Sequence, residues 1–436
     1  MKQATKEHFK QIVVIVLTLL SKKVLKKYSP KIIAVTGSVG KTTTKDAVYS
    51  AIAPFKNVRK SEKSFNSEIG IPLTILGCNN AWSNPLLWFE NFLKGIILIV
   101  FKKQYPDWLV LEVGADRPGD IKKISEWLKP DIVILTKLPD IPVHVEYFSS
   151  TEDLIMEKIN LVAALKKGGL LIINADDENQ LKAVKSFDCR KMTYGTSDAD
   201  MQVSTVLINY AISNDIELPI GITFELIFGD SKTSINIDNI LGNHVALACA
   251  ASAMVAIELG IDFMGVKKGL SMFDRPKGRM NLIDGLKNTS IIDDSYNSSP
   301  VAVEEALNTL KELNCTGKKI IVMGDMLELG SFTNGEHYRL GKLMAQVGDI
   351  LITVGIRAKF FAEGALDAGM SEKNIFQYEN SQKAGQEVQN IMDNGDILLV
   401  KGSQGVRMDR FVEEVMANPE LKNELLVRQS IEWENR

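Results

Sequence analysis

The chain has 436 residues, which is enough for two to four domains and excludes a single small disulfide-stabilised module. Hydrophobic residues make up 45% and charged residues 24%, as in ordinary folded proteins, so neither wholesale disorder nor a collagen-like repeat fits. Because 51 Lys and Arg face 54 Asp and Glu, the net charge is only -3, and we expect no nucleic-acid partner.

Cysteines and histidines are few and scattered. The four cysteines contain no C-x-x-C pair, which favours reduced thiols and a cytoplasmic location: Cys78, Cys189, Cys249 and Cys315. The four histidines are equally far apart, so a metal site must also use carboxylates or hydroxyls. Such donors favour Mg2+ over zinc.

The first 30 residues predict a short helix that is apolar in its middle and basic at its end. An apolar run over 12–20 precedes four lysines, Lys22, Lys23, Lys26 and Lys27. The run is about half of the roughly 20 residues that span a bilayer, and no small-residue cleavage site follows it. We expect a helix that packs on the protein or makes peripheral membrane contact through residues 11–27.

A second apolar stretch runs from Leu86 to Phe101. Because Glu90, Lys94 and Gly95 interrupt it, the stretch predicts an amphipathic helix. Such a helix can face the core or lie on a membrane, and both interpretations stay open.

From residue 31 onward, short β-branched segments alternate with longer helical ones. Strands are predicted at 31–35, 108–112, 131–135 and 169–173, and helices at 41–53, 118–128 and 151–165. This alternation is typical of a parallel sheet with helices on both faces.

The pattern changes between residues 200 and 240. Short alternating strands at 201–208 and 222–228 predict an antiparallel extension, which a helix at 245–259 closes. The stretch 273–279 combines Pro, Gly and charge, and predicts an interdomain hinge.

Beyond that hinge the strand and helix alternation restarts. Strands are predicted at 290–293, 319–323, 350–354 and 397–400, with helices at 301–313 and 336–347. We therefore predict an α/β chain in three parts: a short helix over 1–30, a central parallel-sheet domain with an antiparallel extension over 31–280, and a Rossmann-like α/β domain over 281–436.

One segment between a predicted strand and helix carries the pattern of a phosphate-binding loop. It reads Gly37-Ser38-Val39-Gly40-Lys41-Thr42-Thr43, a short G-x-x-G-K-T form, because Val35 stands where the longer motif has glycine. Glycines let N–H groups approach phosphate oxygens, a helix N-terminus favours anions, and Lys41 adds positive charge. Thr42 is placed to bind Mg2+. We predict a central domain of the P-loop type that binds a nucleotide.

Glu112 ends the predicted strand 108–112. In α/β sheets, ligands bind at the carboxyl ends of the strands. Its carboxylate is therefore a candidate Mg2+ ligand, although a solvated acid at a strand end is the alternative.

Further motifs follow along the chain in a fixed order. They are Lys63-Ser64-Phe65-Asn66-Ser67-Glu68, Leu111-Glu112-Val113-Gly114-Ala115, Asn174-Ala175-Asp176-Asp177, Gly278-Arg279-Met280, Asp293-Asp294-Ser295-Tyr296-Asn297, Gly324-Asp325-Met326-Leu327-Glu328 and Val400-Lys401-Gly402. With the loop, they resemble the Mur ligase family, the ATP-dependent peptide ligases of bacterial cell-wall synthesis. The likeness is greatest to its MurF branch and covers roughly residues 31–410.

The resemblance implies a site for ATP and two Mg2+ ions. It places Thr42 and Glu112 on Mg2+, and His144 on a second ion, because Pro142 to Phe148 is similar to the family's H-L-E-x-F segment. Lys158 stands where similar ligases carry a carbamylated lysine, which turns a cation into an oxygen donor. The family's neighbouring Gly-Glu is Ile159-Asn160 here. Lys41, His144 and Lys158 would be the catalytic residues.

The resemblance also implies a nucleotide contact for Gly37 to Thr43 and for four residues farther along. Arg279 would contact phosphate, Asp294 the ribose and Asn297 the base, with His244 beside them. The family has Asn or Gln after this histidine, whereas Val245 cannot donate or accept, so the base specificity stays open. Asn66 and Ser67 are the candidate substrate residues.

One departure concerns the front of the chain. Ligases of this branch carry an N-terminal domain that grips the uridine diphosphate of the substrate, and only about 30 residues precede the first strand here. We expect no room for that domain. The nucleotide-sugar end would be held by the other domains, by a partner or by the basic helix, or the acceptor differs.

The sequence predicts a monomeric ATP-dependent amide ligase of peptidoglycan precursor synthesis. It would join D-alanyl-D-alanine to a UDP-N-acetylmuramoyl tripeptide through an acyl phosphate, so its partners are a nucleotide-sugar peptide and a dipeptide. One alternative is a Mur-like ligase with a different acceptor, such as a lipid-linked precursor, a folate-type molecule or an amino-acid polymer. The other is a non-catalytic nucleotide-binding partner.

Overall fold

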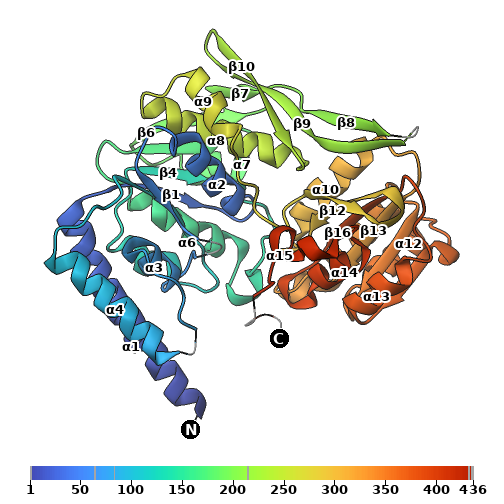
Figure 1. Cartoon of the computed structure of the whole chain (residues 1–436), viewed down its shortest axis with the longest axis horizontal. Helices are drawn as coiled ribbons and strands as arrows, with labels where there is room; N and C mark the ends of the chain where they lie inside the picture. The colour runs from blue at the N-terminus through green and yellow to red at the C-terminus, as the bar shows by residue number, and fades with distance from the viewer. Residues whose placement is uncertain (1, 63–64, 83, 214–215, 431–432, 434–436) are drawn as a thin grey trace.

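Two β-sheets with flanking helices make up the fold, and they lie side by side (Figure 1). The computed structural model describes residues 2–62, 65–82, 84–213, 216–430 and 433. Lys63 and Ser64, which begin the first of the family-like motifs, lie outside the described residues.

The first sheet is parallel over most of its width, as predicted. Its strand order is β10-β9-β7-β6-β5-β4-β1-β3-β2. The parallel strands are β1 (Lys31–Thr36), β2 (Val58–Lys60), β3 (Trp108–Glu112), β4 (Ile132–Leu135), β5 (Leu170–Asn174), β6 (Arg190–Gly195) and β7 (Met201–Val203). Val35 is in register with Glu112 on one side and Ile134 on the other. The residues that follow β1, β3 and β4 therefore meet at one edge of the sheet.

The antiparallel extension is present, but the prediction of one strand over 201–208 is wrong. β7 and β8 (Leu207–Ser213) both pair with β9 (Ile216–Phe228), and β10 (Ser231–Asp238) pairs with its other edge. Val203 is in register with Leu226, whereas Leu207 is in register with Thr223. Three residues thus face two on β9, so the strand is interrupted there, and the register shifts again within β8 between Asn209 and Tyr210. The alternation of side chains alone does not reveal these breaks.

Helices cover both faces of the first sheet. Successive strand residues point to opposite faces, so Ile33 and Val35 pack under one helical layer while Ile32 and Ala34 pack under the other. One layer holds α2 (Lys41–Ile52), α8 (Asn243–Glu258) and α9 (Phe263–Leu270). The other holds α1 (Lys2–Tyr28), α3 (Gly70–Leu76), α4 (Pro85–Val100), α5 (Asp120–Ser125) and α6 (Thr151–Ala163).

The two apolar stretches near the N-terminus become α1 and α4, which lie side by side (Figure 1). The helix α1 buries Val13, Leu17 and Val24, and α4 buries Trp88. Asn84 caps α4, because its side chain accepts hydrogen bonds from the N–H groups of the first turn. Within the described part of the chain, no helix is both long and apolar enough to cross a membrane.

The second sheet has the order β11-β12-β16-β13-β14-β15. Its strands are β11 (Asn281–Gly285), β12 (Thr289–Asp294), β13 (Lys319–Gly324), β14 (Ile350–Val354), β15 (Ile375–Tyr378) and β16 (Ile397–Lys401), and only β11 is antiparallel to its neighbour. The helices of this part are α10 (Pro300–Glu312), α11 (Thr333–Ala345), α12 (Lys359–Asp367), α13 (Ser381–Val388), α14 (Met408–Val415) and α15 (Lys422–Leu425). The predicted α/β class is confirmed for both parts.

A close helix contact supports α2 and yields a stability prediction. A Cβ on Gly269 in α9 would lie 2.7 Å from the Cα and O atoms of Ala51 in α2. We expect Gly269→Ala to lower the free energy of unfolding by about 1–2 kcal/mol, because overpacking costs more than the gain in helix propensity. Thermal unfolding checks this. The control is Gly335→Ala in α11, where a Cβ meets no atom within 4 Å and stability should not fall; equal loss in both variants would contradict the contact.

Candidate functional site

The predicted phosphate-binding loop lies directly against the end of β4. Gly37 follows β1 with φ 144°, and a Cβ there would lie 2.1 Å from Oγ1 of Thr136 and 2.6 Å from its carbonyl oxygen. Only glycine fits so close an approach. Ser38 also donates its N–H to the carbonyl oxygen of Lys137, at 2.9 Å. The loop is thus held at the carboxyl edge of the sheet, and α2 starts immediately after it with Lys41.

Lys41 is a half-buried cation that folds back over this loop. Its Nζ donates to the carbonyl oxygens of Gly37 and Ser38, at 3.0 and 3.2 Å. Burial lowers the pKa of Lys41, and the opposing charge of Glu112 only partly compensates. An anionic ligand in the loop would supply the missing negative charge.

Glu112 presents a carboxylate oxygen without a partner at the same edge. Its side chain is 2% exposed; Oε1 accepts a hydrogen bond from Nδ2 of Asn66 at 3.1 Å, whereas the buried Oε2 has no hydrogen-bond partner among the described residues. A buried unpaired carboxylate oxygen is costly, and a bound cation would satisfy it. The residue types present thus suit a divalent ion held by oxygen atoms.

The two candidate substrate residues differ in their surroundings. The side-chain amide of Asn66 donates to Glu112, whereas the backbone carbonyl oxygen of Asn66 accepts a hydrogen bond from the N–H of Gly114 at 2.9 Å. The hydroxyl of Ser67 accepts from the N–H of Gly70 at 3.4 Å, next to the start of α3. Asn66 therefore orients Glu112, a relation that the sequence motif does not reveal.

Lys158 is buried in α6, 3% exposed, close to Lys41. Burial, and next the charge of Lys41, lower the pKa of Lys158 to about 7. A large share of its side chain is therefore a neutral amine near neutral pH. The negative charge of Asp116 opposes this lowering and also acts to raise the pKa of Lys41. Asp116 directly follows the motif 111–115, but it was not predicted as a site residue.

Glu157 is a further acidic residue that sequence reasoning missed. Its Oε1 accepts from the N–H groups of Ile121 and Lys122 at the start of α5, at 2.7 and 3.0 Å. Its Oε2 accepts from Nδ2 of Asn160 at 3.3 Å. Asn160, where the chain departs from the family pattern, thus donates to a carboxylate three residues earlier.

His144 joins the first part of the chain to the second. It has φ 72°, and its Nδ1 lies 2.6 Å from Oε2 of Glu328, which follows β13, while Nε2 lies 3.6 Å from Oδ1 of Asp116. The imidazole lowers the pKa of Glu328. Among the described residues, no group of three or more His, Cys, Asp or Glu is arranged to hold a metal ion unaided.

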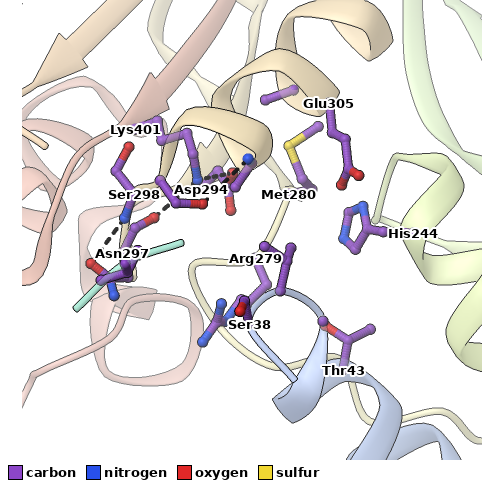
Figure 2. Close-up of a pocket in the computed structure, with 16 residues that line it drawn as sticks. Ser38, Thr43, His244, Arg279, Met280, Asp294, Asn297, Ser298, Glu305 and Lys401 are labelled. Carbon is purple, nitrogen blue, oxygen red and sulfur yellow. Dashed lines mark hydrogen bonds and ion pairs between the residues drawn. The ribbon is translucent and has the colours of Figure 1, made fainter. Parts of the chain in front are cut away.

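A cavity of about 60 Å³ between the two sheets brings most of the predicted nucleotide residues together. Figure 2 shows Arg279 near Ser38 of the loop, with Asp294, Asn297 and Lys401 farther along the cavity. Nη2 of Arg279 donates to Oγ1 of Thr42 at 3.4 Å. The remaining predicted residues on its wall are Val39, Gly40, Thr43 and His244.

Lys401 is a site residue that was not predicted from the sequence. It is buried at the end of β16, where its Nζ donates to Oδ2 of Asp294 at 2.5 Å and to the carbonyl oxygen of Asn297 at 2.9 Å. Its motif, Val400-Lys401-Gly402, was the available signal. Lys401 therefore holds Asp294 and Asn297, the two residues of the second part that were predicted to bind the nucleotide, in position.

A second cavity of about 240 Å³ adjoins the first at Val39, Gly40 and His244. Burial lowers the pKa of His244, so this side chain is neutral at neutral pH. Val245 is fully buried in the hydrophobic core, whereas Asn243 lines the cavity. The polar group next to His244 thus comes from the residue before it.

Comparison with known proteins agrees with this arrangement. The family model described as the Mur ligase middle domain matches residues 95–256, and that of the Mur ligase glutamate ligase domain matches residues 278–404. UDP-N-acetylmuramoyl-tripeptide--D-alanyl-D-alanine ligase of Bacillus subtilis is 28% identical over 401 residues, covering 92% of this chain and 79% of the relative.

Two solved structures show a similar fold. MurF from Acinetobacter baumannii has a TM-score of 0.74 at 23% identity, over 92% of this chain and 80% of that one. MurF from Thermotoga maritima, in complex with ADP, has a TM-score of 0.72 at 24% identity, over 94% and 84%. The loop, the fold and both family matches lead to one conclusion: the chain belongs to the Mur ligase family of ATP-dependent amide ligases.

Proposed function

We propose that this ligase joins D-alanyl-D-alanine to a UDP-N-acetylmuramoyl tripeptide in the cytoplasm, with ATP converted to ADP and phosphate. The B. subtilis relative, which aligns with 92% of this chain, carries that activity in its name. The observation that carries the proposal is the convergence of Lys41, Glu112 and Lys158 at one sheet edge, opposite Arg279. The positive charges of Lys41 and Arg279 there favour a triphosphate and a carboxylate as substrates.

Thr42 and Glu112 would hold Mg2+, and the unpartnered Oε2 of Glu112 supports this assignment. His144 and Lys158 would serve a second ion, with Lys158 as its carbamate. When bound, Mg2+ neutralises charge on the phosphate oxygens. We further propose that the central domain spans 31–280 and the C-terminal domain 281–436, so that β11 begins the second domain.

The first chemical step would be attack of the acceptor carboxylate oxygen on the γ-phosphorus of ATP. The new P–O bond forms as the bond to ADP breaks, which leaves an acyl phosphate. Lys41 and the N–H groups of the loop would balance charge on the transferred oxygens, and Arg279 would do so from the hinge that leads into the C-terminal domain. The burial of Lys41 makes its charge more effective than it would be in water.

In the second step the amine nitrogen of D-alanyl-D-alanine would attack the acyl carbon. The tetrahedral intermediate collapses as the C–O bond to phosphate breaks, and the nitrogen loses its proton. Water must be excluded meanwhile. Two contacts between the domains favour such closure: Lys137 with Glu305 at 2.8 Å and His144 with Glu328 at 2.6 Å. We assign the hinge to residues 274–282.

Product formation tests the proposed reaction. Protein incubated with ATP, Mg2+, UDP-N-acetylmuramoyl tripeptide and D-alanyl-D-alanine should release phosphate only when both acceptor and amine are present, with the joined product identified by mass spectrometry. If product forms only when a different acceptor is supplied, the alternative Mur-like ligase is supported. ATP binding without any product would support the non-catalytic alternative.

Replacing the loop lysine tests its role in phosphoryl transfer. We expect Lys41→Ala to lower kcat about 100- to 1000-fold, because a charge aimed at the transferred oxygens is lost. Steady-state phosphate release measures this. Lys185→Ala, an exposed lysine outside the site, is the control and should keep the wild-type rate; a Lys41→Ala enzyme of similar rate would refute the assignment.

Replacing Asn66 separates a metal-site role from a substrate role. Because Asn66 donates to Glu112, we expect Asn66→Ala to raise the Mg2+ concentration for half-maximal activity about 10- to 100-fold, with a smaller change in the KM of the acceptor. Titration of activity with Mg2+ and then with acceptor measures both. Ser67→Ala is the matched control. An effect of Asn66→Ala confined to the acceptor KM would instead favour direct substrate binding.

Carbamylation of Lys158 should depend on pH. The neutral amine attacks CO2, forming the N–C bond and releasing a proton, so the carbamate should increase as pH rises through about 7, the pKa of Lys158. A carbamate signal from 13C-bicarbonate in NMR spectra taken from about pH 6 to about pH 9 measures it. Lys158→Arg should lack the signal. The same signal in that variant would assign it to another amine.

A further inference from the structure

We propose that α1 and α4 form a surface that binds an anionic lipid bilayer, independently of the ligase reaction proposed above. The outer sides of both helices carry large apolar side chains that are 41 to 79% exposed. They are Phe9, Ile12, Ile15, Leu19, Leu86, Leu87, Phe89, Leu93, Ile96, Ile97 and Val100, continued by Phe101. We call these residues the helix-pair surface. Isolated exposed apolar residues need no explanation, whereas a contiguous set marks an interaction site.

The helix-pair surface is distinct from the faces that hold the helices on the protein. In α1, Leu17 and Val24 are fully buried, whereas Ile12, Ile15 and Leu19 recur every three or four residues on the exposed side. The helices therefore have apolar side chains on opposite sides, one of which packs on the domain. Figure 1 shows the pair at the margin of the molecule, away from the second sheet.

Hydrogen bonds between their C-terminal ends hold the two helices parallel to each other. Nζ of Lys27, at the end of α1, donates to the carbonyl oxygens of Leu98 and Ile99 in the last turn of α4, at 2.9 and 3.0 Å. The hydroxyl of Tyr28 donates to the carbonyl oxygen of Leu98 at 2.9 Å. The C-terminal ends of both helices therefore meet. Exposed lysines gather at this end: Lys22, Lys23 and Lys26 from α1, and Lys102 and Lys103 after α4.

The charge pattern favours anionic lipid over a second copy of the chain. Glu90 is the acidic residue of α4, and it already pairs with Lys94 at 2.8 Å. A self-associating surface would have to supply carboxylates for the clustered lysines, whereas anionic headgroups provide them directly. The apolar side chains would enter the boundary between headgroups and acyl chains, with the helices lying in the plane of the membrane.

The helix pair also lies beside the catalytic edge of the central domain. Nζ of Lys10 in α1 pairs with Oε1 of Glu68 at 3.0 Å, and Glu68 lies two residues after Asn66. Because Asn66 contacts Glu112, a bilayer bound to the helix pair would lie close to the segment that leads into the site. Membrane binding would therefore hold the site of the central domain near the membrane surface.

Vesicle flotation with the full chain tests the proposal. The protein is mixed with vesicles of phosphatidylcholine alone or with about 30% phosphatidylglycerol, in about 0.1 M and about 0.5 M salt. An apolar variant combines Ile15→Ser, Leu86→Ser, Phe89→Ser and Val100→Ser. A charge variant combines Lys22→Glu and Lys23→Glu. A matched control replaces equally exposed apolar residues elsewhere, with Ile212→Ser, Met264→Ser and Ile356→Ser.

We expect the wild type and the control to float with the anionic vesicles at low salt and less so at high salt. The apolar variant should partition at least about 100-fold less, and the charge variant about 25-fold less. All variants should keep wild-type circular dichroism, and the apolar variant and the control should keep wild-type ligase activity without vesicles, which separates this test from that of the proposed function.

Three results would overturn the assignment. The first is wild-type protein that floats with neither vesicle, or equally with both. The second is loss of flotation in the control to the same extent as in the apolar variant. The third is a dimer in sedimentation velocity that the apolar variant abolishes while no vesicle is bound, which would assign the surface to a second copy.

Discussion

The site depends on one close contact, the approach of Gly37 to Thr136. Without a Cβ at Gly37, the chain leaving β1 can turn directly against the residue that follows β4. This contact places the start of α2 at the carboxyl edge of the sheet, where β3 delivers Glu112 from the neighbouring strand. Lys41 and Thr42 then occupy the first turn of α2, within reach of Arg279 from the hinge between the two domains. A larger side chain at position 37 would displace all of these groups together.

Charge is the second organising feature of the site. Lys158 is buried and Lys41 is half-buried, and the charge of Lys41 adds to the effect of burial in lowering the pKa of Lys158. Glu112 and Asp116 oppose these shifts without cancelling them. A pocket whose lysine charge is only partly compensated favours anionic substrates, which is what an enzyme that binds ATP and a carboxylate requires. The same imbalance leaves Lys158 able to exist as an uncharged amine.

The N-terminal helix α1 has apolar side chains both on its buried side and on its exposed side. The apolar run of α1 is too short to span a bilayer, and its sequence allows either packing or membrane contact. In the structure one side of the helix packs on the domain and the other is exposed: Leu17 is buried and Ile15 is exposed. The hydrophobic pattern alone cannot assign these sides, because α1 is apolar around much of its circumference and the position of α3 and α4 decides which side is covered.

Several features follow from the sequence alone, because they rest on neighbouring residues: the α/β class, the positions of the main strands along the chain and the loop that leads into Lys41. The alternation of buried strands with helices is local, and so is the glycine pattern of the loop. Only the tertiary structure places His144 on Glu328 and Lys401 on Asp294, or shows the break between β7 and β8. These pairs join residues more than 100 positions apart or depend on the register of a partner strand. No local pattern encodes such contacts, because they arise from how sheets and helices pack together.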